Sequence, residues 1–233
     1  MFSVTCLGKN GLYPTKNEPT SGYLIKCGDT RVLVDIGSGV FAALLAIMRP
    51  EDLDAVIVSH FHGDHSSDLT VFNYYLTHTG KKLRLYAPET GENVVKEHNN
   101  FIYNKVVDGE TIALKGVIIK FFKTNHPVHC LGVKMVYDDK TFVYSADTNV
   151  CENLDHALEG ADLAVLDCAF SSATYKPNGP HLCSVLCAEY AKKYNVKTLL
   201  SHLPPEGDVG TIISEANKIT DLCRLIEKKE YFI

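Results

Sequence analysis

The sequence lacks tryptophan, has no Cys-x-x-Cys pair, and contains no apolar run approaching the ~20 residues that a membrane-spanning helix needs. Its first residues, Met-Phe-Ser-Val-Thr-Cys-Leu-Gly, show neither the cationic segment nor the long apolar segment of a signal peptide. We therefore expect a cytoplasmic protein without a membrane partner. The eight cysteines are scattered along the chain, which in that compartment predicts reduced, mostly buried thiols and argues against a structural zinc knuckle.

Positive charge is also scarce, because 23 lysines and arginines stand against 28 acidic residues and leave a net charge of −5. The basic stripe of a dedicated nucleic-acid binder is not visible, so we expect no DNA-binding module. An anionic substrate would then have to be attracted by local positive charge, such as a bound metal ion. The 233 residues are 45% hydrophobic, which predicts one soluble globular domain spanning residues 1–233.

Two β-rich blocks, each followed by helices, make up the predicted organisation. Strands are predicted at residues 2–7, 23–27, 31–35, 54–59, 83–87, 106–107, 111–114, 117–123, 132–137, 141–145, 163–168 and 198–201. Helices are predicted at residues 40–48, 66–79, 89–99, 152–159, 181–194 and 211–218, and a final hairpin at 222–233 turns at 227–230. This order suggests two similar halves and favours two mixed sheets packed face to face with helices outside.

The chemistry of the chain is concentrated in one six-residue loop, where His60, His62, Asp64 and His65 directly follow an apolar strand. Burying imidazole and carboxylate groups costs free energy unless they are paired or bound to metal, so packing explains this cluster poorly. In an extended loop His60 and His62 point the same way and can hold one ion. Asp64 and His65 lie beyond the bend that Gly63 allows and can face a neighbouring ion. A solvated loop rich in histidine is the alternative, which this restrictive spacing disfavours.

The segment His60-Phe61-His62-Gly63-Asp64-His65 resembles the metal-binding motif of the metallo-β-lactamase superfamily. Further segments resemble its ribonuclease Z-like branch, and the similarity covers nearly the whole chain: Leu7-Gly8, Tyr13-Pro14, Ser21-Gly22-Tyr23-Leu24, Val34-Asp35-Ile36-Gly37-Ser38-Gly39, Leu53-Asp54-Ala55-Val56, Tyr144-Ser145-Ala146-Asp147-Thr148 and Ser201-His202-Leu203. The resemblance implies an α/β fold, the metallo-β-lactamase αββα sandwich, and a metal-dependent hydrolase with two divalent ions. Several branches share the acidic fourth position, so the motif specifies the fold better than the substrate.

The resemblance also implies the remaining metal ligands. By position they are His126 with His60 and His62 at the first metal, Asp147 bridging both metals, and His202 with Asp64 and His65 at the second metal. The sequence pattern supports this assignment in part, because Asp147 and His202 each follow an apolar strand, as the histidine loop does. A lone polar residue in such a place is, however, more often a cap. His129 competes with His126. The family pattern and the spacing of six residues to Gly132 favour His126, which leaves His129 as a polar residue at the rim.

Three further residues receive roles around this centre. In the ribonuclease Z-like branch a histidine in the place of His181 faces the scissile phosphate, where it neutralises charge or protonates the leaving group. The alternative for His181 is a histidine at a helix start that contacts the backbone. Asp35 is expected to orient a metal ligand from outside the ligand set, and Asp167 to act likewise near His181. The histidines expected at exposed positions on helices are His78, His98 and His156.

The predicted activity is hydrolysis of a phosphodiester through a metal-bound hydroxide, with Asp64 and His181 as catalytic residues. Zinc suits the histidine and aspartate ligands, and Mn²⁺ or Fe²⁺ suits them as well. The tRNA-processing members of the branch carry a long arm after the third motif, whereas here only 21 residues separate His126 from Asp147. The His-Glu-Ala-Thr segment of the branch is replaced by Leu-Asp-Cys-Ala-Phe. A small or cyclic phosphodiester is therefore at least as well supported as an RNA 3′ end.

Two other functions compete with this prediction. A carbonyl hydrolase, such as a lactonase or thioesterase, would use the same metal centre, although a site specialised for lactams usually has cysteine in the place of Asp147. A non-catalytic, metal-stabilised binding protein would be marked by lost ligands, and none is lost here. The resemblance to the branch also suggests a homodimer.

Overall fold

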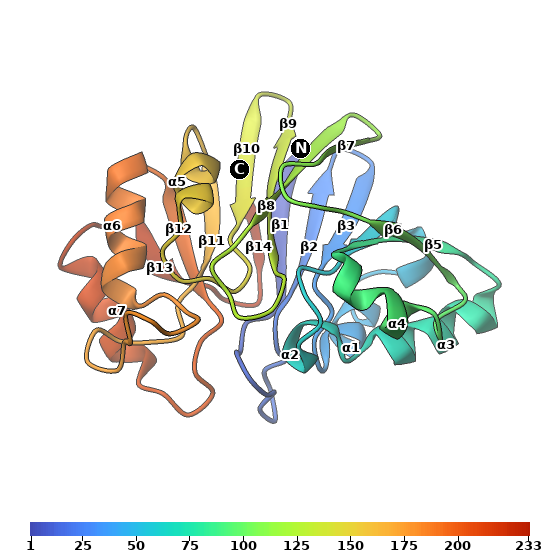
Figure 1. Ribbon diagram of the computed structural model, residues 1–233, viewed down its shortest axis with the longest axis horizontal. Coiled ribbons are helices and arrows are strands. Elements are labelled where there is room, and N and C mark those ends of the chain that lie inside the picture. The colour runs from blue at the N-terminus through green and yellow to red at the C-terminus, as the bar shows by residue number, and fades with distance from the viewer. The chain divides into compact units, whose positions relative to one another are not determined.

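The computed structural model describes all 233 residues, which form two compact units, each built on one seven-stranded mixed sheet (Figure 1). The first unit comprises Met1–Val107 and Lys228–Phe232, and the second comprises Asp108–Glu227 and the final residue. In each sheet, three antiparallel strand pairs are followed by three parallel pairs. This shared order agrees with the expectation of two similar halves. No helix combines the length and the hydropathy that crossing a membrane requires.

The first sheet has the strand order β14-β1-β2-β3-β4-β5-β6. Its strands are β1 (Phe2–Gly8), β2 (Gly22–Cys27), β3 (Thr30–Val34), β4 (Ala55–Ile57), β5 (Leu83–Ala87), β6 (Phe101–Lys105) and β14 (Glu230–Phe232). The helical segments of this unit are α1 (Val40–Leu45), η1 (Pro50–Asp52), α2 (Gly63–Ser66), α3 (Leu69–Thr79), η2 (Glu89–Gly91) and α4 (Glu92–Val95). Helix α3 buries Leu69, Phe72 and Leu76 in the core of the unit, as their helical spacing predicts.

The second sheet has the strand order β13-β12-β11-β10-β9-β8-β7. Its strands are β7 (Thr111–Leu114), β8 (Val117–Lys123), β9 (Leu131–Tyr137), β10 (Lys140–Tyr144), β11 (Leu163–Asp167), β12 (Lys197–Ser201) and β13 (Cys223–Leu225). The helices are α5 (Glu152–Leu158), α6 (Ser184–Tyr194) and α7 (Val209–Asn217). Strands β11 and β12 are entirely buried apart from Lys197, as expected for central parallel strands covered on both faces.

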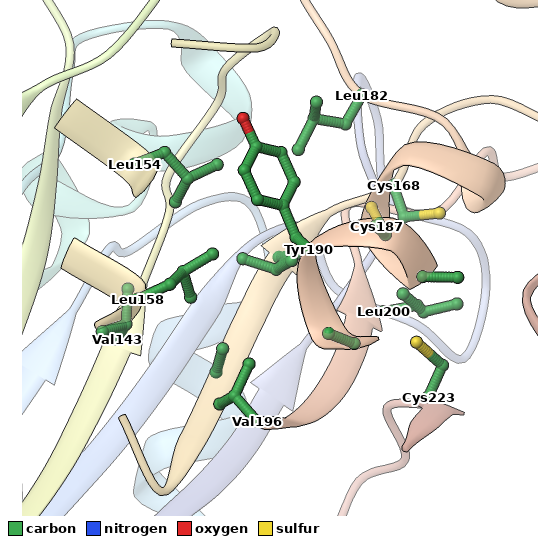
Figure 2. Packing of buried hydrophobic residues seen from close by; sticks show 14 of the residues in the cluster. Val143, Leu154, Leu158, Cys168, Leu182, Cys187, Tyr190, Val196, Leu200 and Cys223 are labelled. Carbon is green, nitrogen blue, oxygen red and sulfur yellow. The ribbon is translucent and has the colours of Figure 1, made fainter. Parts of the chain in front are cut away.

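Buried aliphatic, aromatic and cysteine side chains fill the core of the second unit. Figure 2 shows Tyr190 of α6 beside Leu154 of α5, in the same cluster as Leu200 of β12 and the side chains of Cys168, Cys187 and Cys223. All eight cysteines of the chain are free thiols, and all but Cys151 are buried. Burial raises the pKa of the Cys187 thiol well above its ordinary value, so this thiol stays neutral and packs as an apolar group. The prediction of mostly buried free thiols agrees with the structure.

The C-terminal tail does not form the predicted hairpin. Strand β13 pairs in parallel with β12 of the second sheet, whereas β14 pairs antiparallel with β1 of the first sheet. The two short strands therefore extend different sheets. A local sequence pattern records strand propensity but not the edge that accepts a strand, so a hairpin and two separate edge strands look alike in sequence.

The segment before the second sheet also differs from the prediction. The helix expected at 89–99 is short and ends at Val95, and the strand that follows is β6 rather than residues 106–107. His98, expected to be exposed, is 7% exposed, because its ring bonds to the Thr70 hydroxyl and the Val94 carbonyl. These partners come from the preceding helices, which explains why the position of His98 along the chain did not predict its burial.

We expect Leu200→Ala to lower the free energy of unfolding by roughly 2–5 kcal/mol, because Leu200 is fully buried and its truncation leaves a cavity in the core. Urea unfolding followed by circular dichroism measures the change. The matched control is Leu45→Ala, since Leu45 is 47% exposed on α1 and its truncation should change the stability by less than about 0.5 kcal/mol. Equal losses in the two variants would contradict the assignment of Leu200 to the core.

Candidate metal centre

The predicted site residues gather at one edge of each sheet, beyond the carboxyl ends of strands that pair in parallel. In the first unit, Asp35 follows β3 and His60 follows β4. In the second unit, Asp147 follows β10, Asp167 ends β11 and His202 follows β12. Parallel strands bring the residues after them to a common edge, where open α/β sheets characteristically bind ligands. Each unit thus presents one cluster of metal-binding side chains.

His60 and His62 form the first half of the cluster in the first unit. Nε2 of His60 lies 3.0 Å from Nδ1 of His62, with the ring centroids 4.6 Å apart. The other nitrogen of His60, Nδ1, lies 3.0 Å from the Ser59 hydroxyl. Two convergent imidazole nitrogens suit a shared cation, and the serine contact fixes which nitrogen of His60 faces it.

Asp35 organises the second half of this cluster through three hydrogen bonds. Its Oδ1 accepts the Ser59 backbone N–H at 2.7 Å, and its Oδ2 accepts the Ser59 hydroxyl at 2.8 Å. The same Oδ2 accepts Nδ1–H of His65 at 2.7 Å, and all three residues are buried. This bond fixes the His65 tautomer, so that Nε2 is the nitrogen that would ligate a metal ion. Asp35 thus fixes the orientation of His65, which is a predicted metal ligand.

Asp64 lies next to His65, with its Oδ2 3.7 Å from Nε2 of that ring. The same oxygen accepts the backbone N–H of Leu12 at 2.8 Å, which anchors the loop after β1 to the histidine loop. The backbone of Asp64 packs directly on Gly37, where a Cβ atom would lie 2.0 Å from the Asp64 carbonyl oxygen. Glycine is therefore required at position 37 for the histidine loop to approach the end of β3.

The cluster of the second unit contains Asp147, Asp167, His181 and His202, whose donor atoms all lie within 4.8 Å of one another. His202 lies between the two carboxylates, with Nε2 3.4 Å from Oδ1 of Asp147 and Nδ1 3.4 Å from Oδ1 of Asp167. The rings of His181 and His202 stack with centroids 4.8 Å apart. Both carboxylates and His202 are buried, so the cluster holds concentrated charge away from water.

His181 does not start a helix, as the sequence had suggested, because α6 begins at Ser184. It lies in the preceding loop, and its Nδ1 donates to Oδ2 of Asp167 at 2.8 Å. Burial by itself lowers the pKa of His181, but the charge of Asp167 and this hydrogen bond outweigh burial, and the pKa is raised above its ordinary value. Asp167, which the sequence indicated only weakly, thus orients His181 and favours its cationic form.

Of the two histidines that competed for the third position, His126 is the one beside the cluster. Its Nε2 lies 4.0 Å from Oδ2 of Asp147, and its Nδ1 contacts the Pro180 carbonyl oxygen at 3.4 Å. His129 belongs to none of the groups of close donor atoms. This placement favours His126 over His129 as the ligand.

Left-handed backbone conformations, with positive φ, occur at three non-glycine positions around the site. Asp35, Ala146 and His202 have φ values of 59°, 52° and 54°. Residues other than glycine adopt such values rarely and at a cost of about 1–3 kcal/mol, and they cluster at functional sites. Each of the three follows directly, or within two residues, a strand that pairs in parallel. The chain turns sharply there and directs the polar side chains to the sheet edge.

Asn149 contributes to the site in a way that sequence patterns did not reveal. Its Nδ2 donates to the carbonyl oxygens of Pro177 and Gly179, and its Oδ1 accepts the Tyr175 hydroxyl. These bonds hold the loop that carries His181. The only hint in the sequence is that Asn149 stands two residues after Asp147. That position does not predict the contact of Asn149 with the loop that carries His181.

The composition of both clusters fits a divalent transition-metal ion. The donors are imidazole nitrogens and carboxylate oxygens, several of them buried, and second hydrogen bonds orient the rings of His60, His65 and His181. Zinc, iron(II) and manganese(II) accept such donors. Ca²⁺ and Mg²⁺ prefer sites made of oxygen alone. The donors therefore support metal binding without selecting one of the three ions.

Residues 30–202 match the model of the family described as the beta-lactamase superfamily domain. The chain belongs to this superfamily. The matched region contains the histidine loop and extends to His202, so it covers every predicted ligand. The recognition of the metallo-β-lactamase superfamily from the histidine loop is confirmed.

Similar proteins match nearly the whole length of this chain. It is 29% identical over 231 residues to the "Probable metallo-hydrolase YhfI" of Bacillus subtilis (strain 168), covering 94% of this chain and 93% of YhfI. A crystal structure of YhfI, a metallo-β-lactamase fold protein, matches 99% of this chain and 98% of that chain with a TM-score of 0.93. A ribonuclease Z of Thermococcus sibiricus is 26% identical over 301 residues, covering 99% of this chain and 98% of that protein.

A crystal structure of a diphosphatase from the PhnP family matches at a TM-score of 0.81 with 19% identity, covering 100% of this chain and 98% of that chain. It shows a shared fold. With the match to YhfI, it confirms the predicted fold class. The family, the fold and the buried histidine and aspartate clusters together support a metal-dependent hydrolase.

Proposed function

We propose that the chain is a dinuclear metal-dependent phosphodiesterase acting on a small or cyclic phosphodiester. The observation that carries the proposal is His181, whose ring is held by Asp167 at 2.8 Å and lies with Nδ1 4.0 Å from Oδ2 of Asp147. A histidine that Asp167 orients beside a predicted metal ligand can donate a hydrogen bond to a substrate whose reacting group is an anion. A carbonyl substrate is uncharged and gains less from this arrangement.

The ligand assignment of the proposal follows the superfamily pattern. The residues that would hold the ions are His60, His62 and His126 at one position, Asp64, His65 and His202 at the other, and Asp147 at both. When bound, two divalent ions supply Lewis acidity to a phosphoryl oxygen and lower the pKa of water towards neutrality. Zinc is the proposed ion, with Mn²⁺ and Fe²⁺ as alternatives that the same donors accept.

The protein residues would bind the substrate, transfer protons and orient the reacting groups. Asp64 lies 3.7 Å from the ligating nitrogen of His65, where its carboxylate can bind an ion and accept a proton from the attacking water. His181 would hold a non-bridging oxygen of the phosphate or give its proton to the leaving group. Asp35 and Asp167 fix the tautomers of His65 and His181, which removes the need for these rings to reorient during the reaction.

A small substrate is favoured over a folded RNA by what lies between His126 and Asp147. That interval contains β9, a turn at Asp138 and Asp139, and β10, with no inserted arm. The net charge of −5 also gives no general attraction for a polyanion. The ribonuclease Z relative supports phosphodiester chemistry, and processing of an RNA 3′ end remains a second form of the same proposal.

The test is hydrolysis of bis(4-nitrophenyl) phosphate by protein supplied in turn with Zn²⁺, Mn²⁺ and Fe²⁺, beside an acyl thioester and a lactone. Turnover of the diester that requires metal supports the proposal. Turnover of the carbonyl substrates alone would overturn it in favour of a lactonase or thioesterase. Failure to hydrolyse any of them with two metals bound per chain would instead favour the non-catalytic alternative.

A further inference from the structure

A cavity of about 410 Å³ lies within the second unit, between the turn that follows β11 and the start of α7. Phe170, Ser171 and Thr174 line it from the turn, and Asp208, Thr211 and Ile212 line it from the helix side. Its volume falls within the range of roughly 300–1,000 Å³ that is usual for small-molecule sites. None of the residues assigned above to metal binding or catalysis lines this cavity.

Hydrogen bonds hold both walls of the cavity in place. The turn is fastened to α7 by Glu215, which accepts the backbone N–H of Ser172 at 2.8 Å and its hydroxyl at 2.6 Å. Asp208 caps α7 by accepting the Thr211 backbone N–H at 3.1 Å and its hydroxyl at 2.6 Å. The backbone N–H of Ser184 bonds to the Phe170 carbonyl oxygen at 2.9 Å. The cavity is therefore formed before a ligand enters, which lowers the entropic cost of binding.

Phe170 connects the cavity to the predicted reaction centre. Its ring lies edge-on to the His181 ring, with the centroids 5.9 Å apart, and the same residue lines the cavity. On the opposite wall, Pro204 stands two residues after His202. A substrate whose phosphate lies at His181 would thus have its adjoining substituent next to this cavity.

The lining selects the chemistry of that substituent. No lysine, arginine or histidine lines the cavity, and one carboxylate, Asp208, does. A second phosphate or another anion would meet no countercharge there and would be repelled by Asp208. An aromatic face at Phe170, an aliphatic wall at Ile212, and hydroxyl and carboxylate groups at the edge suit a flat, uncharged ring that carries hydrogen-bonding atoms.

We propose that this cavity binds the base of a nucleotide-derived phosphodiester and that Phe170 determines the selection of substrates that carry such a ring. The inference rests on the proposed phosphodiesterase function and adds the substrate class. Stacking of a base on an aromatic side chain tolerates many base identities, so we expect a preference for nucleosides over alkyl groups rather than for one particular base.

The test compares two diesters that share one leaving group, thymidine 5′-(4-nitrophenyl) phosphate and methyl 4-nitrophenyl phosphate, with the metal-loaded full chain. We expect kcat/KM to favour the nucleoside diester by roughly tenfold or more in the unmodified protein. Phe170→Ala should reduce that ratio about tenfold, and Phe170→Tyr should restore most of it. The matched control is Phe232→Ala, which truncates a phenylalanine that is 66% exposed in the first unit and should leave the ratio unchanged.

Binding of free thymidine, measured by saturation-transfer NMR on the metal-loaded protein, gives a readout that does not need turnover. We expect a signal from the base protons that Phe170→Ala abolishes. A ratio near one in the unmodified protein, or equal losses for both diesters in Phe170→Ala, would overturn the inference while leaving phosphodiesterase activity established. If neither diester is hydrolysed but thymidine binds through Phe170, the proposed function fails and the base site stands.

Discussion

Replacing Asp64 with alanine is expected to lower kcat for a phosphodiester by about a thousandfold or more, which corresponds to ~4 kcal/mol of lost transition-state stabilisation. The Oδ2 atom of Asp64 lies 3.7 Å from Nε2 of His65, and the superfamily pattern places Asp64 at the second metal. Its removal takes away a ligand and a negative charge together. The bound metal per chain, measured by elemental analysis, should fall along with the rate.

Asp64 also accepts the backbone N–H of Leu12, so alanine removes a structural bond as well as a ligand. Asp64→Asn separates the two effects, because the amide oxygen still accepts that hydrogen bond while the charge is lost. We expect Asp64→Asn to keep a nearly unchanged melting temperature and to lose most of the activity. The matched control is Asp52→Ala, an exposed carboxylate on η1 that should leave both metal content and rate unchanged. Full activity in Asp64→Asn would remove Asp64 from the catalytic residues.

The second large effect is expected from Asp167→Asn, which should lower kcat roughly 10- to 100-fold. Asp167 acts as a positioning residue, because its Oδ2 accepts both Nδ1–H of His181 and the backbone N–H of Thr148. An asparagine in that place has one acceptor oxygen instead of two, so it cannot satisfy both donors and His202 in the same way. His181 should then lose its fixed tautomer and its bias towards the cationic form.

Two measurements distinguish positioning from a general loss of structure. The ¹⁵N chemical shifts of the His181 ring should report a changed tautomer in Asp167→Asn, and kcat should fall more than KM rises. The control is Asp139→Asn, in the exposed turn between β9 and β10, where φ is 58° and asparagine is well tolerated. An unchanged His181 spectrum together with a reduced rate would assign the effect to metal binding through His202 instead.

What the structure adds is the set of partners that each side chain has within its own unit. Asp35 and Asp167 occupy corresponding places, since each accepts the Nδ1–H of one histidine and a backbone N–H of the sheet edge. The two halves of the chain therefore use the same device, a buried carboxylate that fixes a histidine tautomer.

Much of the fold was determined by local sequence. The alternation and apolar runs of the strands predicted β5, β7 and β8 at their observed bounds, because a strand that faces a core must place its hydrophobic residues with period two or bury them all. The histidine loop likewise indicated a metal-binding site without any tertiary information. Four metal-binding side chains within six residues cost too much free energy to retain for packing alone.

Other features were decided only by the tertiary structure. The tail could pair with itself or with two sheet edges, and the free edges of β1 and β12 determined which it did. His98 is buried in part because Thr70, on the distant helix α3, supplies a hydrogen-bond partner to its ring. Asp167, Asn149 and Phe170 carry no motif. Their places beside His181, in the loop before it and in the cavity wall follow from parallel strands that bring distant segments to one edge, a relation that local propensity does not encode.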